Sequence, residues 1–344
     1  MPALACPRLV SRSLLAGLLG MGLLLAALGA PAAGAQSVGA DSAAVRLIVD
    51  TDANNELDDQ HALAYALLSG GAFRVEGLTV NRTNNGGDLA AQAREARRVV
   101  RLTGLRGRVP ILRGASGTYE AIAPTANQDG FDGAEAVNFI IERARADDGR
   151  PLVVVAIGKL TNVALALKKA PSIADEMRVV WLGSNFPEPG EYNLANDPSA
   201  VNPVLDSGVP FEIAVVRYGR STGTFAVQTF QSEVQAVMPG LGPEVASPVT
   251  GRHGGTHTTF GDYSVALFEH IDQDARALYD VAAVSVVKNP AWATRRVVGP
   301  YRLEDGAWVR QDSGPKLVIW ELFCGPRILR DFYDTLRHPV PAAK

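Results

Sequence analysis

Short apolar runs alternate along the chain with segments whose apolar residues recur every three or four positions. The short runs are typical of buried strands, and the spacing of three to four is typical of one helix face. The pattern predicts strands at residues 45–49, 75–80, 109–112, 152–156, 178–182 and 211–216. It predicts helices at residues 58–69, 89–102, 134–146, 160–169, 198–205 and 278–287. Because apolar strands separated by helices form mostly parallel sheets covered on both faces, we expect a Rossmann-like, doubly wound α/β fold.

Two later segments have a different pattern. Residues 245–263 are rich in Gly, Thr, His and Pro, which predicts a loop or lid. Residues 297–319 alternate between apolar and polar positions, with turn signals at Asp305-Gly306 and Ser313-Gly314. This alternation predicts antiparallel strands that follow the parallel part of the fold.

The first 35 residues have the features of a secretory signal peptide. Arg8 and Arg12 precede an uncharged apolar run at residues 14–30, and Ala33-Gly34-Ala35 supplies small residues for cleavage before Gln36. We therefore expect an exported protein, periplasmic or secreted, that has no membrane contact after cleavage. Residues 36–344 are expected to form a single domain.

Composition narrows the classes of partner. The chain of 344 residues is 47% hydrophobic, so it can build a large core. Its formal net charge of −3 comes from scattered charges, without the basic patch that a phosphate backbone requires. We therefore expect small-molecule substrates and no polymeric nucleic acid as a partner.

Acidic residues are concentrated directly after the first predicted strand. Asp50, Asp52, Glu56, Asp58 and Asp59 lie within ten residues, where a strand ends and a helix begins. Helix N-termini favour one or two acids, but a group this dense needs a counter-charge. Oxygen ligands without His or Cys select a hard cation, so the cluster predicts a calcium or magnesium site at the carboxyl edge of the sheet.

The order of several motifs resembles that of the inosine/uridine-preferring nucleoside hydrolases, whose first strand ends in DxDxGxDD. Residues 156–162 (AIGKLTN) resemble the family's TGPLTN, Leu182-Gly183 its MGG, Glu191-Tyr192-Asn193 its EFN, and Asp197-Pro198 its DP. The resemblance spans residues 46–290. It implies the nucleoside hydrolase fold, a dimer or tetramer, and calcium-dependent hydrolysis of the N-glycosidic bond of ribonucleosides to base and ribose. With export, it suggests salvage of extracellular nucleosides.

The resemblance also implies roles for individual residues. Asp52, Asp59 and Asp280 would bind Ca²⁺ through their carboxylates, with the backbone carbonyl of Ile157 as a further ligand. The substrate-binding residues would be Asp58, Asn84, Asn185, Glu191 and Asn193. Asp52 would also accept the proton of the attacking water, and Asp50 would orient its neighbours.

Two positions depart from the family pattern. Many members have His directly before the last calcium aspartate, where this chain has Tyr279, a poor acid at neutral pH. We expect Tyr279, or else His253 or His257 from the loop at residues 245–263, to act on the leaving base. The second departure is the loop at residues 53–57, which is two residues longer than the family's and adds Glu56.

Two other functions remain open at this stage. A protein with the same fold and calcium site could bind a nucleoside or sugar without turnover. Asp50-Thr51-Asp52 also resembles the nucleophile motif of haloacid-dehalogenase-like phosphatases, although that motif places Thr or Val where this chain has Asn54.

Overall fold

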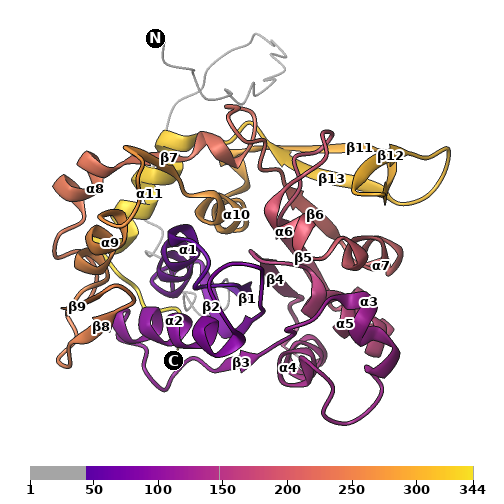
Figure 1. The fold of residues 1–344 in the computed structure, drawn as a ribbon, viewed down its shortest axis with the longest axis horizontal. Helices are drawn as coiled ribbons and strands as arrows, with labels where there is room; N and C mark the ends of the chain where they lie inside the picture. Colours follow the sequence, from indigo (N-terminus) through magenta and orange to yellow (C-terminus); the bar gives the residue numbers. More distant parts are fainter. Residues whose placement is uncertain (1–43, 147, 344) are drawn as a thin grey trace, which may run out of the picture.

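The computed structural model describes residues 44–146 and 148–343 (Figure 1). The expected signal peptide, residues 1–35, lies outside this part of the chain. Among the described residues, no helix has both the length and the apolar composition needed to cross a bilayer.

The described residues form a nine-stranded sheet with the strand order β12-β11-β13-β6-β5-β4-β1-β2-β3. The strands from β13 to β3 in this order are parallel, and β11 and β12 extend one edge as antiparallel strands. The strands of the sheet are β1 (Val45–Thr51), β2 (Phe73–Val80), β3 (Ile111–Arg113), β4 (Leu152–Ala156), β5 (Met177–Leu182), β6 (Phe211–Ala214), β11 (Thr294–Glu304), β12 (Ala307–Arg310) and β13 (Lys316–Glu321). Two small antiparallel pairs lie outside it: β7 (Gln228–Phe230) with β10 (Ala275–Ala277), and β8 (Val249–Gly251) with β9 (Gly254–His257).

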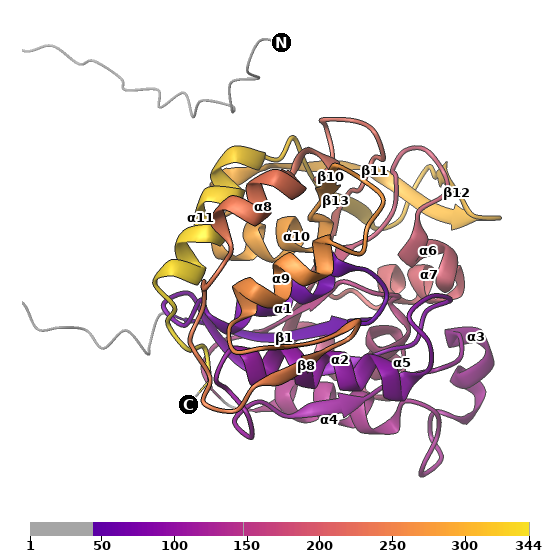
Figure 2. The ribbon, with the colours of Figure 1, turned by 60° about the vertical axis from the view of Figure 1, so that its left-hand side comes forward.

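Helices cover both faces of the sheet. The helices are α1 (Leu57–Leu67), α2 (Leu89–Leu102), α3 (Tyr119–Ile122), α4 (Ala134–Arg145), α5 (Thr161–Lys169), α6 (Tyr192–Asn196), α7 (Val201–Asp206), α8 (Gln231–Val237), α9 (Phe260–Phe268), α10 (Tyr279–Lys288) and α11 (Gly325–Arg337). One core contains buried residues of α1, α2, α8, α9, α10 and α11, and the other contains those of α3, α4, α5, α6 and α7. Figure 2 shows α11 on the outer side of α10, and β8 running beside α2.

The central strands are buried on both faces, which explains their continuous apolar sequences. Along β1, Leu47 and Val49 belong to the core on the α1 side, whereas Ile48 belongs to the core on the α5 side. β5 repeats this alternation, with Val180 on the first side and Trp181 on the second. The expected doubly wound α/β fold is therefore confirmed.

The strand order places a crevice beside β1. The chain runs outward from β1 through β2 to β3, and then returns to β4 on the other side of β1. In such sheets, ligands bind outside the carboxyl ends of the strands at the point where the direction of winding changes. The acidic segment that follows β1 lies at this point.

The C-terminal part differs from the expectation in two places. Residues 245–263, expected to be a loop or lid, contain the hairpin β8–β9 and the first residues of α9. Their glycines serve the tight hairpin: Gly254 and Gly255 have φ values of 95° and 68°. The helix α11 was not predicted, although it buries Ile328, Leu329, Phe332 and Leu336 at helical spacing. The expected antiparallel strands are confirmed, and Asp305 and Gly306 form the turn between β11 and β12 with positive φ at both residues.

Candidate active site

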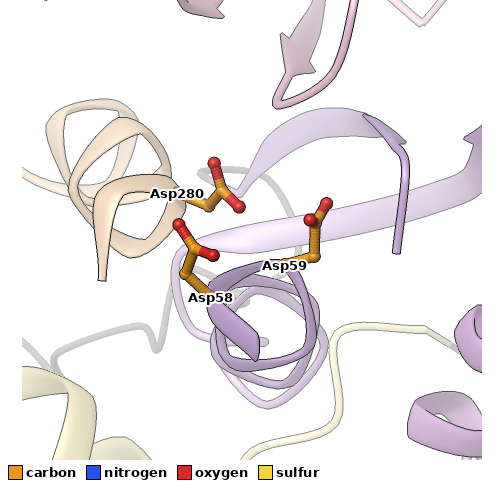
Figure 3. Close-up of side chains that lie close together, drawn as sticks. All are labelled: Asp58, Asp59 and Asp280. Atoms are coloured by element: carbon orange, nitrogen blue, oxygen red, sulfur yellow. The ribbon is translucent and has the colours of Figure 1, made fainter. Parts of the chain in front are cut away.

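Three aspartates meet at the carboxyl edge of the sheet. Asp58 and Asp59 lie in the first turn of α1, and Asp280 lies in the first turn of α10. One carboxylate oxygen of each lies within 4.8 Å of the others, and all three residues are buried. Figure 3 shows the three carboxylates gathered between the two helices.

Helix packing brings these residues together. α1 packs against α10, so the N-termini of the two helices lie close to each other. The backbone N–H groups of Tyr279 and Asp280 interact with the carboxylate of Asp58. Because helix N-termini carry a partial positive charge and free N–H groups, this arrangement partly offsets the repulsion between the acids.

Two further aspartates lie at the end of β1. The carboxylate of Asp50 accepts hydrogen bonds from Thr79 Oγ1 at 2.6 Å, Asn162 Nδ2 at 2.7 Å and Asn81 Nδ2 at 3.0 Å. Asp50 thus links the end of β1 to the end of β2 and to α5. Asp52 Oδ2 accepts from Thr83 Oγ1 at 2.5 Å.

Some carboxylate oxygens in this group have no donor. In the described part of the chain, the buried atoms Asp52 Oδ1 and Asp280 Oδ1 have no hydrogen-bond partner. A buried polar atom without a partner costs roughly 1–3 kcal/mol, and more when it is charged. The pair of unpartnered oxygens therefore fits a cation better than a purely structural hydrogen-bond network.

Burial and mutual repulsion raise the pKa values of these acids. Desolvation by burial raises the pKa of Asp50 to about 6 and, together with repulsion from neighbouring carboxylates, the pKa values of Asp52 and Asp58 to about 7. The same two causes raise the pKa values of Asp59 and Asp280 well above their usual range. A bound cation would offset both effects, because it replaces lost solvation and screens like charges.

These shifts predict that the metal-free protein loses stability as the pH rises from about 4 to about 7. In this range the folded protein keeps protons on Asp52 and Asp58 that the unfolded chain has released, so the stabilising contribution disappears as the pH passes the folded pKa values of about 7. Calcium requires the deprotonated carboxylates, so it should raise the melting temperature more at pH 8 than at pH 5. Thermal unfolding with calcium or with a chelator at both pH values measures this difference. An equal calcium effect at both pH values would contradict the prediction.

A cavity of about 370 Å³ lies over the aspartates. Its acidic side includes Asp58, Asp59 and Asp280 beside Ile157, and a polar side adds Glu191 and Asn193. The aromatic residues Tyr218, Phe225 and Tyr279 and the cation Arg276 also line it. The lining thus combines carboxylates with aromatic rings.

Glu191 and Asn193 are held rigidly at the start of α6. The carboxylate of Glu191 accepts hydrogen bonds from the backbone N–H groups of Ser184, Asn193 and Leu194 at 2.9–3.0 Å. Burial nevertheless raises the pKa of Glu191. Asn193 Nδ2 donates to the backbone carbonyls of Ile157 and Leu182, both at 3.1 Å. The Ile157 carbonyl, the expected calcium ligand, therefore lies at the cavity with Asn193 as a partner.

The two other asparagines expected to bind substrate do not line this cavity. Asn84 is exposed, and its backbone N–H donates to Asn196 Oδ1 at 2.7 Å. The side-chain amide of Asn185 donates to the Gly190 carbonyl, and its oxygen accepts from the backbone N–H of Tyr218 at 3.4 Å. Asn185 thus stabilises the loop that carries Glu191.

The two histidines expected at the leaving base also lie outside the cavity lining. His253 stacks on His270, with ring centroids 4.1 Å apart, and lines a neighbouring cavity of about 180 Å³. His257 packs against Tyr263, and its buried Nε2 atom has no hydrogen-bond partner among the described residues. Tyr279 does line the main cavity, and burial raises its pKa to about 12. At neutral pH Tyr279 can therefore donate a hydrogen bond but cannot act as an efficient acid.

Three residues that line the cavity were not predicted from the sequence: Arg276, Tyr218 and Phe225. Arg276 forms an ion pair with Glu56, from the loop that is longer than in the family pattern, and its Nη2 atom is 3.8 Å from Asp58 Oδ1. The unusual acid Glu56 was the one available sign that a basic partner lies near the site.

The sequence matches a known protein family. The model of the family "Inosine-uridine preferring nucleoside hydrolase" matches residues 47–316. An uncharacterized protein of Schizosaccharomyces pombe is 28% identical over 226 residues, covering 59% of this chain and 70% of that protein. The inosine-uridine preferring nucleoside hydrolase of Crithidia fasciculata is 28% identical over 184 residues, covering 47% of this chain and 56% of that protein.

The fold also matches solved structures. A plant nucleoside hydrolase, PpNRh1, superposes with a TM-score of 0.66 at 19% sequence identity, covering 86% of this chain and 99% of that chain. At this identity the superposition concerns the fold, whereas the family match extends over most of the sequence. The resemblance to haloacid-dehalogenase-like phosphatases has no support in these matches. The chain therefore belongs to the family of inosine-uridine preferring nucleoside hydrolases, as a divergent member.

Proposed function

We propose that the protein hydrolyses the N-glycosidic bond of ribonucleosides in the cavity above Asp58, Asp59 and Asp280, with Ca²⁺ bound to the aspartates. The observation that carries the proposal is the cavity itself, whose lining includes both buried carboxylates and aromatic rings. Cleavage of this bond develops positive charge on the sugar and negative charge on the base. Carboxylates suit the sugar, and aromatic faces suit a planar base.

The donor set fits a hard cation. Asp58, Asp59 and Asp280 form the group of carboxylates that could hold the cation. Asp52, which lies outside this group, and the Ile157 carbonyl are the other oxygen ligands that the family resemblance implies. Oxygen donors with two unpartnered carboxylate atoms favour calcium over zinc. The chemistry that such a cation supplies is neutralisation of the carboxylates and activation of water.

The residues of the chain would perform three tasks. Asp52 would accept a proton from the attacking water, because its buried Oδ1 atom has no hydrogen-bond partner among the described residues. Asp58, Glu191 and Asn193 would hold the ribose hydroxyls, so that binding energy favours the distorted, positively charged sugar. The rings of Tyr218, Phe225 and Tyr279 would stack on the base and exclude water from it.

Some assignments made from the family resemblance remain predictions. Asn84 and Asn185 would have to turn toward the cavity to hold the sugar. His253 and His257 would need the β8–β9 hairpin to move before either could reach the leaving base. The oligomer, a dimer or tetramer, and export to the periplasm or the medium through the signal peptide at residues 1–35 are likewise proposals, supported by the family and by the N-terminal sequence respectively.

The first experiment is an assay of reducing-sugar release from inosine, uridine, adenosine and p-nitrophenyl riboside. We expect cleavage of at least one substrate in calcium, loss of cleavage after chelation, and recovery when calcium is returned. Tight calcium binding without cleavage of any of the four substrates would overturn the proposal in favour of a nucleoside- or sugar-binding protein. Cleavage that persists after chelation would overturn its metal dependence.

A further inference from the structure

Arg276 lines the cavity beside the ring of Tyr279. It lies in β10, where its backbone pairs with Thr229 of β7, three residues before the start of α10. Its side chain is 17% exposed, and its Cζ atom lies 5.6 Å from the centre of the Tyr279 ring. Arg276 is thus a largely buried cation beside the expected position of the base.

Glu56 holds this guanidinium group in place. Glu56 and Arg276 form an ion pair through Arg276 Nη2, and both residues lie in the wall shared by the main cavity and its smaller neighbour. Glu56 directly precedes α1, whose first turn carries Asp58 and Asp59. The ion pair therefore links the guanidinium group of Arg276 to the segment that carries two of the three aspartates. Tyr279 supports the group from the other side by a cation–π contact.

The guanidinium group keeps unused hydrogen-bonding capacity. The buried Nε–H of Arg276 has no acceptor among the residues that the structure describes. Arginine has five N–H donors in a fixed fork, and the ion pair with Glu56 uses the Nη2 end. A ligand atom that accepts hydrogen bonds would therefore complete the coordination of this side chain.

The lining of the cavity holds charges of both signs. Its carboxylates include Asp58, Asp59, Asp280 and Glu191. Arg276 is the cationic side chain among the lining residues, paired with Glu56 and 3.8 Å from Asp58. Fixed charges aimed at the charge that develops in a reaction are among the strongest catalytic devices, because they need no reorganisation. Carboxylates favour positive charge on the sugar, and a guanidinium group favours negative charge on the base.

We propose that Arg276 is the catalytic residue that stabilises the departing base, with Glu56 as its positioning residue. The inference rests on the proposed nucleoside hydrolase function. When the bond between the anomeric carbon and the base nitrogen breaks, its electron pair goes to the base, and Arg276 donates a hydrogen bond to a ring nitrogen or exocyclic oxygen without giving up a proton. Water supplies the hydroxyl group to the sugar and a proton to a carboxylate, and the base anion takes a proton from solvent.

The test compares leaving groups that need stabilisation with one that does not. Arg276→Met should lower kcat/KM for inosine and uridine by about 10²–10³-fold, the usual loss when one preorganised donor is removed. The loss for p-nitrophenyl riboside should be less than about tenfold, because nitrophenolate is a stable anion. The matched control is Arg302→Met on β11, where Arg302 forms an exposed ion pair with Asp206 of α7. This variant should leave kcat/KM unchanged for all substrates.

Two further variants separate catalysis from folding. Arg276→Ala should regain part of its inosine activity when guanidinium is added at millimolar concentration, which a misfolded variant would not. Glu56→Gln should lower kcat for inosine by up to about 10²-fold with little change in KM. The Arg276 guanidinium would still be present but displaced, and small displacements of a catalytic group slow a reaction strongly.

Different results would refute the role of Arg276 and the proposed nucleoside hydrolase function. Wild-type protein that cleaves none of the substrates would refute the proposed function. Wild-type cleavage, combined with equal losses for inosine and p-nitrophenyl riboside in Arg276→Met, would refute the role of Arg276 alone. Failure of guanidinium to restore any inosine activity to a folded Arg276→Ala variant would also refute it.

Discussion

Replacing Asp280 by asparagine should abolish nucleoside hydrolysis and remove the stabilisation that calcium gives the protein. The carboxylate of Asp280 is buried, has one unpartnered oxygen and faces Asp58 and Asp59. Activity should fall by more than about 10²-fold, the scale of loss seen when a group that merely supports a metal ligand is removed. In wild-type protein, calcium at 100 times its Kd should add about 2.7 kcal/mol of stability, and the variant should lose most of this gain.

The same substitution should have the opposite effect on the metal-free protein. At pH 8, Asp280→Asn removes one of several buried like charges, so the variant should melt at a higher temperature than wild type in the presence of a chelator. Asp312→Asn, an exposed residue in the turn before β13, serves as the control and should change neither activity nor calcium response. A variant of Asp280 that keeps the full calcium-induced shift would show that the cation binds elsewhere.

The largest effect on stability is expected at the opposite end of β1, at Arg46. This buried side chain donates to both carboxylate oxygens of Glu76, at 2.7 and 3.1 Å, and to the backbone carbonyls of Arg143, Ala146 and Arg150. It therefore connects β1 with β2 and with the segment between α4 and β4. Arg46→Met should cost about 3–5 kcal/mol of unfolding free energy, the range for breaking a buried ion pair.

Chemical denaturation of Arg46→Met and Arg302→Met measures this difference. Arg302 pairs with Asp206 on the surface, where such pairs are worth about 0–1 kcal/mol. A loss below about 1 kcal/mol for Arg46→Met would mean that Arg74 and Arg143, which also contact Glu76, compensate for the missing guanidinium.

The sequence pattern predicted the sheet and its helices because both depend on local periodicity. The bounds of α2 and β4 agree with the prediction to the residue, since each is limited by a clear change of pattern at its ends. By contrast, α11 follows the last strand with Cys324-Gly325-Pro326 at its start, and turn-forming residues there obscured a helix whose apolar positions are regularly spaced.

Only those residues of the candidate site that directly follow a strand could be predicted from the sequence. The acids after β1 could be recognised because the carboxyl ends of parallel strands meet at one edge. Arg276 could not be recognised, because its contact with Glu56 joins residues far apart in the chain and depends on the small β7–β10 pair. The glycine-rich segment at residues 245–263 was correctly seen as unusual, yet composition alone could not show that its histidines pack away from the cavity.

The charged side chains at the two ends of β1 differ in how they are balanced: they are ion-paired at one end and repel one another at the other. Arg46 lies at the start of the strand in an ion-pair network, and Asp52 follows six residues later in a group of buried carboxylates, roughly 20 Å away at about 3.3 Å per residue. At such a separation, the free-energy effects of substitutions add nearly independently. Substitutions around the cavity can therefore change the preferred base without weakening the Arg46 network. The stability that this network provides allows the fold to tolerate cavity substitutions that are themselves destabilising.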